Sequence, residues 1–337
     1  MIIVLKPNIS KRQEVAVLKE IRKLGYRPHV MRGVARIVIG AIGDERTHRS
    51  LETLMTWPQV ENVMPVQRRY KLVSREAHPA NSTIQVRNLV IGAKKLHIMA
   101  GPCSVETEKQ LLKTAEVVKA AGATILRGGA FKPRTSPYEF QGLGEKGLKL
   151  LDKARKATGL AIITELLSEH HAEMVAEYTD IIQIGARNAQ NFQLLIAAAK
   201  TGKPVLLKRG LSMKIEEWLL AGEYVLANEN ANLMFCERGI RTFETYTRNT
   251  LDLSTIPIIK QESHCPVVID PSQGAGRADL VIAMCKGAVA MGADALLVEV
   301  HPNPAEAWSD GAQQLTPERF GKLMRELRPF IQAAGRE

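Results

Sequence analysis

The sequence contains no apolar run that approaches the ~20 residues needed to cross a bilayer. Its first residues lack the basic start and the small-residue cleavage site that a signal peptide would show. The four cysteines have no regular pairing, which argues against a disulfide framework and fits a reducing compartment. We therefore expect a cytoplasmic protein that has no membrane partner.

The charge of the chain is unevenly placed. The formal net charge is +11, and residues 1–90 hold 16 Lys and Arg against 7 Asp and Glu, a balance of +9 that leaves +2 for the rest. A basic domain of this kind can bind nucleic acid. Here the basic residues fall on the outward face of an expected helix, with no interleaved aromatics and no known nucleic-acid motif. We therefore expect no nucleic acid partner. The basic face of this helix is expected to be solvated or to contact another subunit.

The apolar pattern over residues 1–66 predicts a small βαββαβ domain. Strands are expected over residues 2–5, 28–34, 36–42 and 60–66, and helices over residues 11–24 and 47–55. Gly25 is expected to end the first helix and Gly33 to turn a hairpin. This order is typical of the ferredoxin-like module. Residues 67–90 are polar and irregular and predict a linker, with a short strand or hairpin over 84–90 that caps the bottom of the next domain.

Residues 91–337 repeat a pattern of one buried strand followed by one helix. Eight such strands are expected, beginning near His97, Ala123, Ala161, Ile181, Pro204, Asn232, Pro266 and Ala295. They are continuous apolar runs, as in parallel strands that are covered on both faces. Eight units in a segment of this length predict a (β/α)8 (TIM) barrel. A doubly wound open sheet is less favoured, because no Gly-x-Gly-x-x-Gly follows the first strand.

Basic residues follow several of the expected strands. They are Arg127, Lys132, Arg134, Arg187, Lys208 and Arg238. Any one of them alone is most simply a surface ion pair. In a barrel, however, the loops after the strands converge on one face, so the six should gather there. Because cations packed together repel one another, the pattern predicts anionic ligands, such as two phosphate-bearing substrates.

A second set of residues suits a metal ion. Cys103 ends the first barrel strand, Glu299 ends the eighth, and Asp310 lies in the loop after it. One thiolate with two carboxylates suits a divalent transition metal that acts as a Lewis acid. Cys103 taken alone is equally well explained as a buried free thiol.

Several segments together resemble one enzyme family. They are Gly-Pro-Cys-Ser at 101–104, 127–138 with its Lys-Pro-Arg-Thr-Ser core, 185–188, 207–210, 236–242, Asp-Pro-Ser at 270–272, and 299–314. These segments look like the type I-beta branch of the 3-deoxy-D-arabino-heptulosonate 7-phosphate (DAHP) synthases, in order and over the whole barrel. Residues 1–66 resemble the regulatory domain that is appended to some members.

The resemblance implies condensation of phosphoenolpyruvate with erythrose 4-phosphate, with release of phosphate, as the first step of the shikimate pathway to aromatic amino acids. The residues expected to hold phosphoenolpyruvate are Arg127, Lys132, Arg187, Lys208 and Arg238. Arg134, with Thr135 or Ser136, would hold the phosphate of the sugar. Lys132, Cys103 and Asp310 are the expected catalytic residues. A homotetramer, and inhibition by tyrosine or phenylalanine bound to residues 1–66, are further expectations from the family.

One position departs from the family pattern. The family motif reads Asp-Pro-Ser-His, and its histidine is a metal ligand, whereas this chain has Gln273 there. The resemblance gives Cys103, Gln273, Glu299 and Asp310 as ligands for Mn²⁺, Fe²⁺, Co²⁺ or a similar ion. A glutamine oxygen is a weaker and harder ligand than imidazole. We therefore expect reduced metal affinity. The protein would then be a working enzyme with an altered metal preference, a weakened or inactive paralogue, or an engineered variant.

Other readings of the barrel remain open. His301, two residues after Glu299 on the same side of a strand, is a candidate replacement ligand, although its own family motif favours a separate role. A catalytically silent barrel that still binds phosphoenolpyruvate or an aromatic amino acid is one alternative function. A related sugar-acid synthase that makes 3-deoxy-D-manno-octulosonate 8-phosphate is another. Residues 132–136 and the tail around Asp310 speak against this last alternative.

Overall fold

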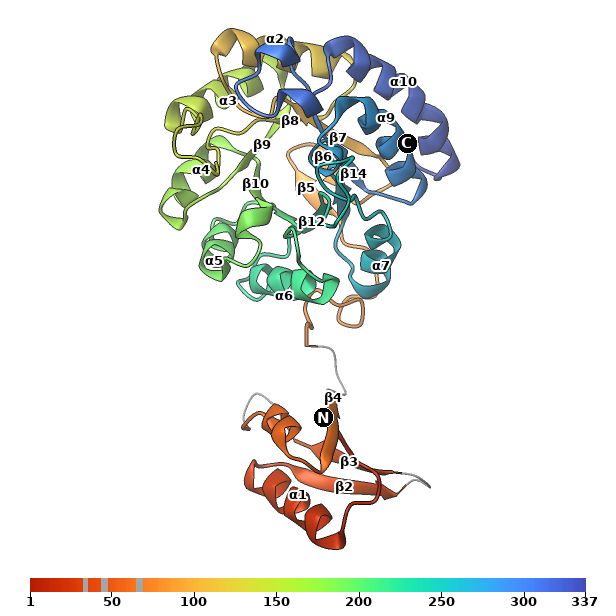
Figure 1. Ribbon diagram of the computed structural model, residues 1–337. Coiled ribbons are helices and arrows are strands. Elements are labelled where there is room, and N and C mark those ends of the chain that lie inside the picture. The colour runs from red at the N-terminus through yellow and green to blue at the C-terminus, as the bar shows by residue number, and fades with distance from the viewer. Residues whose placement is uncertain (33–35, 44–47, 65–68) are drawn as a thin grey trace. The chain divides into compact units, whose positions relative to one another are not determined.

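The chain folds into two units, Met1–Arg69 and Tyr70–Glu337. The computed structural model describes residues 1–32, 36–43, 48–64 and 69–337 (Figure 1). Within these ranges, no helix has both the length and the apolar character required to span a membrane. Each unit has a hydrophobic core of its own.

The first unit is a four-stranded antiparallel sheet with the order β2-β3-β1-β4. Its strands are β1 Ile2–Leu5, β2 Arg27–Arg32, β3 Ile37–Ile42 and β4 Val60–Met64. Helix α1, Lys11–Lys23, begins with a capping box in which Ser10 and Gln13 each satisfy a backbone N–H of the other. The sheet order and the elements confirm the expected ferredoxin-like arrangement.

The second helical segment of this unit differs from its expectation. In place of an α-helix over 47–55, the described residues form a short 3₁₀-helix, η1, at Leu51–Thr56. Its end has a local cause, because Trp57 precedes a proline and is therefore held in the extended conformation, with φ −81° and ψ 131°. The expected turn at Gly33 and the expected element ends at residues 47 and 66 lie outside the described residues.

The second unit is a closed barrel of eight parallel strands, which confirms the expected (β/α)8 fold. The strands are β7 His97–Gly101, β8 Ile125–Arg127, β9 Ala161–Glu165, β10 Ile181–Ile184, β11 Val205–Lys208, β12 Leu233–Glu237, β13 Val267–Ile269 and β14 Ala295–Glu299. The surrounding helices are α2 Glu108–Ala120, α3 Glu145–Thr158, α4 Ala172–Tyr178, α5 Phe192–Lys200, α6 Ile215–Leu226, α7 Thr255–Glu262, α9 Ala278–Ala290 and α10 Pro317–Ala333 (Figure 1). Strand β14 pairs with β7 and so closes the ring.

Alternation along the strands sorts side chains between the inside and the outside of the barrel. On β11, for example, Val205 and Leu207 pack in the layer toward the helices, whereas Leu206 packs in the inner cluster. The next inward position of β11 is Lys208, which is buried near the carboxyl end of the strand. Apolar residues therefore fill the lower interior, and ionisable residues occupy the inward positions above them.

A hairpin closes the amino-terminal end of the barrel. Strands β5, Ile84–Val86, and β6, Leu89–Ile91, pair antiparallel, and three of their side chains join the inner apolar cluster. His97, at the start of β7, contacts the carbonyl oxygen of Val90 at 3.2 Å. Because the hairpin plugs this end, the open end of the barrel lies at the carboxyl ends of the strands.

Candidate active site

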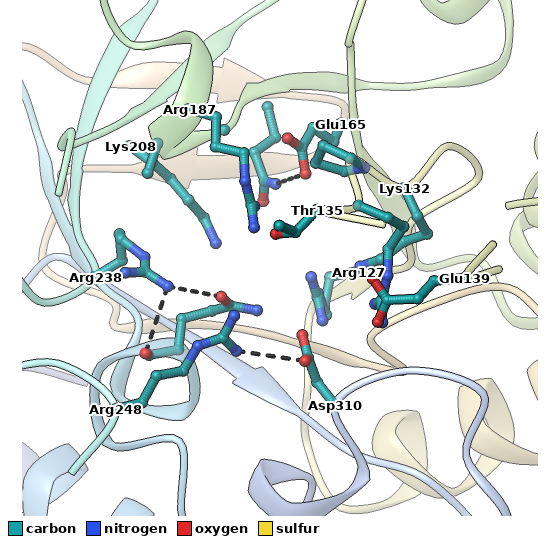
Figure 2. A pocket seen from close by; sticks show the side chains of 16 residues that line it. Arg127, Lys132, Thr135, Glu139, Glu165, Arg187, Lys208, Arg238, Arg248 and Asp310 are labelled. Atoms are coloured by element: carbon teal, nitrogen blue, oxygen red, sulfur yellow. Dashed lines mark hydrogen bonds and ion pairs between the residues drawn. The ribbon is translucent and has the colours of Figure 1, made fainter. Parts of the chain in front are cut away.

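A polar pocket of about 200 Å³ opens at the carboxyl ends of the barrel strands. Its lining includes most of the sequence-predicted site residues, namely Arg127, Lys132, Arg134, Thr135, Arg187, Lys208, Arg238, Gln273 and Asp310. Figure 2 shows Arg187 and Lys208 pointing toward the centre of this pocket, with Arg238 and Arg248 across from Arg127 and Lys132. The basic residues that follow separate strands therefore meet at one site.

The carboxylate of Glu299 is the most heavily bonded group below the pocket. Arg127 donates to its Oε1 at 2.6 Å, Gln273 donates to the same oxygen at 3.0 Å, and Gln313 donates to Oε2 at 2.6 Å. Burial alone would raise the pKa of Glu299, but Arg127 and Lys132 outweigh it and hold the pKa at about 2. Glu299 is therefore ionised at neutral pH.

Cys103, Glu299 and Asp310 form a compact group of possible metal ligands, with their ligand atoms all within 4.8 Å of one another. The Sγ of Cys103 lies 3.4 Å from Asp310 Oδ2 and 3.0 Å from Lys132 Nζ. Burial, with Glu299 nearby, raises the pKa of Cys103 to about 11, so the thiol keeps its proton at neutral pH in the protein alone. One thiol and two carboxylates at this spacing fit a divalent ion that would displace that proton.

The backbone at Asp310 is held in a conformation that aspartate rarely adopts. Its φ is +45°, in the left-handed region that costs free energy for residues other than glycine. Arg248 holds the carboxylate from the other side, with NH1 3.4 Å from Oδ1. Asp310 thus adds the second carboxylate of the group beside Cys103, and the ion pair with Arg248 helps to hold it there.

The side-chain amide of Gln273 lies between Glu299 and Arg238. Its Nε2 donates to Glu299, and its Oε1 accepts from Arg238 NH2 at 2.8 Å. The orientation of the amide is fixed chemically, because a flip would place the NH₂ group against a guanidinium and the oxygen against a carboxylate. In this arrangement the oxygen of Gln273 is engaged by Arg238.

Two further cations have anionic or polar partners. Lys208 Nζ forms a buried ion pair with Asp270 Oδ2 at 2.5 Å. Burial lowers the pKa of Arg238, and the nearby Asp270 opposes that shift. Asp270, directly after β13, thus supplies the negative charge that balances Lys208 at the end of β11.

The loop after β8 brings Arg134 and Thr135 to the pocket rim. Arg134 NH2 forms an ion pair with Glu139 at 2.6 Å, and this hydrogen bond raises its pKa. Ser136 is not among the lining residues; its backbone N–H donates to Glu139 at 3.3 Å. Arg187 belongs to the short helix η3, Ala186–Asn188, and is exposed to solvent at the pocket.

His301 does not approach the metal-ligand group. Its Nδ1 accepts the backbone N–H of Asn303 at 3.0 Å, which leaves the proton on Nε2. Nε2 contacts Glu106 Oε2 at 3.2 Å, and both side chains are buried. Among the described residues, the group of possible metal ligands does not include His301, so the structure does not support His301 as the replacement for the missing histidine.

Sequence reasoning missed several residues of the pocket. Glu165 ends β9 and Gln183 lies on β10, and the two are joined by a hydrogen bond of 3.2 Å. The inward alternation of these strands would have identified both. Arg248 lies in the long loop after β12, far from any strand end, and no local pattern marks it.

The fold and the pocket define a (β/α)8 protein in which many basic side chains line one pocket beside a group of possible metal ligands. Family comparisons agree: the DAHP synthetase I family matches residues 75–333, and the DAHP synthase ferredoxin-like domain matches residues 1–68. The chain therefore belongs to the DAHP synthetase I family and is an aldol-type transferase.

Individual relatives extend this result. The chain is 49% identical to a phospho-2-dehydro-3-deoxyheptonate aldolase of Thermotoga maritima, over 99% of both chains. The crystal structure of the Thermotoga maritima enzyme matches with a TM-score of 0.95 at 48% identity, over 100% of this chain and 98% of that one. A 2-dehydro-3-deoxyphosphooctonate aldolase of Caulobacter vibrioides is 32% identical over 74% of this chain and 91% of its own length.

Replacing Glu299 by glutamine should strongly destabilise the barrel. The change leaves the buried Arg127 guanidinium without its counter-charge, which typically costs about 3–5 kcal/mol. Since the folded-state pKa of Glu299 is lowered to about 2, its stabilising contribution is complete above its ordinary pKa near 4.5 and is lost as the pH falls toward 2. Chemical denaturation should therefore show a large difference between wild type and Glu299→Gln at pH 7, and a shrinking difference below pH 4.5.

Glu326→Gln is a matched control for this experiment. Glu326 forms ion pairs with Lys286 and Lys322 and is one-third exposed, so its loss should cost less than about 1 kcal/mol. A Glu299→Gln protein no less stable than Glu326→Gln would show that the buried pair does not hold the site together.

Proposed function

We propose that the protein condenses phosphoenolpyruvate with erythrose 4-phosphate to give DAHP and inorganic phosphate. The observation that carries the proposal is the meeting of basic side chains from separate strands in one pocket, directly beside Cys103, Glu299 and Asp310. The membership of the family supports the same reaction. The pocket places basic side chains next to the carboxylates that pair with some of them. This arrangement suits two small substrates that each carry several charges.

Phosphoenolpyruvate would occupy the inner part of the pocket. Its phosphate and carboxylate need several fixed cations, and Lys132, Lys208 and Arg238 are each at least nine-tenths buried around that space. Arg127 and Arg187 complete the set. Because Lys132, Lys208 and Arg238 are already held by neighbours, little reorganisation of these three groups is needed when charge shifts during the reaction.

The sugar phosphate would lie nearer the rim. Arg134 and Thr135 line the pocket there, and Ser136 follows them in the same loop. Arg134 is paired with Glu139 in the protein alone, so the incoming phosphate would exchange with that carboxylate. This placement puts the aldehyde end of the sugar toward Cys103 and Lys132.

Cys103, Glu299 and Asp310 would hold a divalent ion such as Mn²⁺, Fe²⁺ or Co²⁺, with Gln273 as the expected fourth ligand. The ion, when bound, would polarise the aldehyde oxygen toward attack by the enol carbon. Lys132 Nζ, 3.0 Å from Cys103 Sγ, is placed to give a proton to the oxygen that becomes a hydroxyl. Arg127 keeps Glu299 ionised for its role.

Two alternatives are separated from this reaction by one assay. A silent paralogue would bind phosphoenolpyruvate but release no phosphate. A synthase for 3-deoxy-D-manno-octulosonate 8-phosphate would accept arabinose 5-phosphate instead. With phosphoenolpyruvate and added divalent metal, phosphate release should therefore require erythrose 4-phosphate. Release that occurs with arabinose 5-phosphate as the second substrate, but not with erythrose 4-phosphate, would contradict the proposal.

Replacing Lys208 by alanine should weaken phosphoenolpyruvate binding by about 2–5 kcal/mol, because a buried charge partner is removed. Calorimetric titration of phosphoenolpyruvate measures the change directly. Lys153→Ala, which removes an exposed lysine paired with Glu108 on the barrel exterior, is the matched control and should leave the affinity unchanged. Equal affinity in the Lys208 and Lys153 variants would remove Lys208 from the substrate site.

Replacing Gln273 by histidine should raise both metal affinity and activity. Loss of a direct ligand weakens binding by more than the ~10–100-fold seen for changes outside the ligand set. The wild-type protein should thus show low, metal-dependent activity with a preference for harder ions such as Mn²⁺. Metal titration gives a readout that is independent of turnover.

Gln193→His, which adds an exposed histidine on α5, controls for adventitious metal binding. Equal metal affinity and equal activity of wild type and Gln273→His would show that this ligand position is unimportant. Absence of activity in both proteins would favour the silent-barrel alternative.

The ferredoxin-like unit is proposed to bind tyrosine or phenylalanine as a feedback inhibitor, within a homotetramer. Its own hydrophobic core, formed around Ile3, Val17 and Ile39, supports removal of residues 1–66 without loss of the barrel. The truncated protein should retain activity but lose inhibition by the amino acid. Inhibition that persists at the same concentration in the truncated protein would place the effector site elsewhere.

A further inference from the structure

A second cavity, of about 140 Å³, adjoins the main pocket. Ala186, Arg187, Arg238 and Arg248 line both spaces, so the two are neighbours with a shared wall. Leu211, Arg241 and Asn249 line only the second cavity. None of the roles proposed above uses Arg241 or this space.

The charge of the second cavity differs from that of the main pocket. Its lining contains four arginines, Arg187, Arg238, Arg241 and Arg248, and no carboxylate. In the main pocket, by contrast, cations are paired with carboxylates such as Glu299 and Asp270. Four guanidinium groups around a small space repel one another unless an anion lies among them.

Two of these arginines have unused hydrogen-bond donors. Among the described residues, the guanidinium groups of Arg187 and Arg241 make no hydrogen bond or ion pair, and both side chains are exposed. Arg248 is engaged with Gln313 at 3.1 Å and with Asp310, and Arg238 with Gln273. The free donors therefore face the cavity from two separate loops.

The backbone that carries Arg241 is fixed. Its N–H donates to the carbonyl oxygen of Leu211 at 2.7 Å, which ties the loop after β12 to the loop after β11. Ile240 and Thr250 pair with each other across this loop, and Thr242 contacts Thr250 at 2.6 Å. The position of Arg241 at the cavity is thus set by the backbone and needs no ligand.

We propose that this cavity binds one phosphate dianion and receives the phosphate released in the main pocket, an assignment that rests on the proposed function. Guanidinium forks match the oxygens of a phosphate in both charge and geometry. The shared residues Arg187, Arg238 and Arg248 let an anion pass from one space to the other without leaving basic contacts. Arg241 is then the residue that distinguishes the second site from the first.

Binding of inorganic phosphate to the enzyme saturated with phosphoenolpyruvate tests the site. The Arg134→Gln background removes the competing sugar-phosphate site, and no turnover occurs without the sugar. This protein should bind one phosphate per chain in calorimetry. Adding Arg241→Gln should weaken that binding about tenfold or more, as expected for lost hydrogen bonds to a charged group, and Arg241→Lys should restore part of it.

Arg328→Gln in the same background is the control, because it removes one exposed arginine from α10 on the outside of the barrel. Phosphate affinity should not change in this control. Phosphate binding that is absent in the Arg134→Gln background, or equal with and without Arg241→Gln, would overturn the proposal. Failure to bind phosphoenolpyruvate in the preliminary titration would instead refute the proposed function.

Steady-state kinetics assign the source of the phosphate. With Arg241→Gln alone, the inhibition constant for added inorganic phosphate should rise about tenfold, while KM for phosphoenolpyruvate stays constant. A rise in KM for erythrose 4-phosphate with unchanged phosphate inhibition would overturn the release role and assign the cavity to the incoming sugar phosphate.

Discussion

The buried carboxylate of Glu299 is the constraint on which the pocket depends. A lone carboxylate in the barrel interior would be costly, so its neighbours must supply positive charge and donors. Arg127, Gln273 and Gln313 do so at distances of 2.6 to 3.0 Å. Each of those partners comes from a different segment, so this one group fixes three parts of the site relative to one another.

The alternation of barrel strands explains where the remaining charges lie. Lys208 ends β11 and Asp270 directly follows β13, each two residues after an inward apolar residue, Leu206 and Val268 respectively. The adjacent residue Arg209 faces the opposite way and pairs with Glu237 at 3.0 Å, away from the pocket. Two neighbouring basic residues, Lys208 and Arg209, thus face opposite ways, because the side-chain period of a strand is two.

Much of the fold was predictable because its signals are local. Continuous buried strands, helix starts such as Ser10, and the glycine after α1 are each visible in a short window of sequence. The 3₁₀-helix η1 was not, because six residues before a proline are too few to show a helical period. The gathering of basic residues in one pocket was also predictable, since it follows from the closed barrel.

The arrangement within the pocket was not predictable, because it depends on contacts between distant segments. The sequence does not indicate that His301 is bonded to Glu106, 195 residues away, or that Arg248 reaches Asp310 from another loop. At His301 and Arg248, the direction of the side chain depends on which buried group in a distant segment needs a partner. The local sequence does not indicate where that group lies.

Gln273 shows how such contacts couple the two halves of the site. Its amide receives a hydrogen bond from Arg238 on the substrate side and gives one to Glu299 beside the metal-ligand group. Arg127 extends this chain of hydrogen bonds from the other side of Glu299, and bonds in such a chain polarise one another. Arg238, Gln273, Glu299 and Arg127 therefore form one continuous hydrogen-bonded network, so a substitution at Gln273 removes a partner from both Arg238 and Glu299.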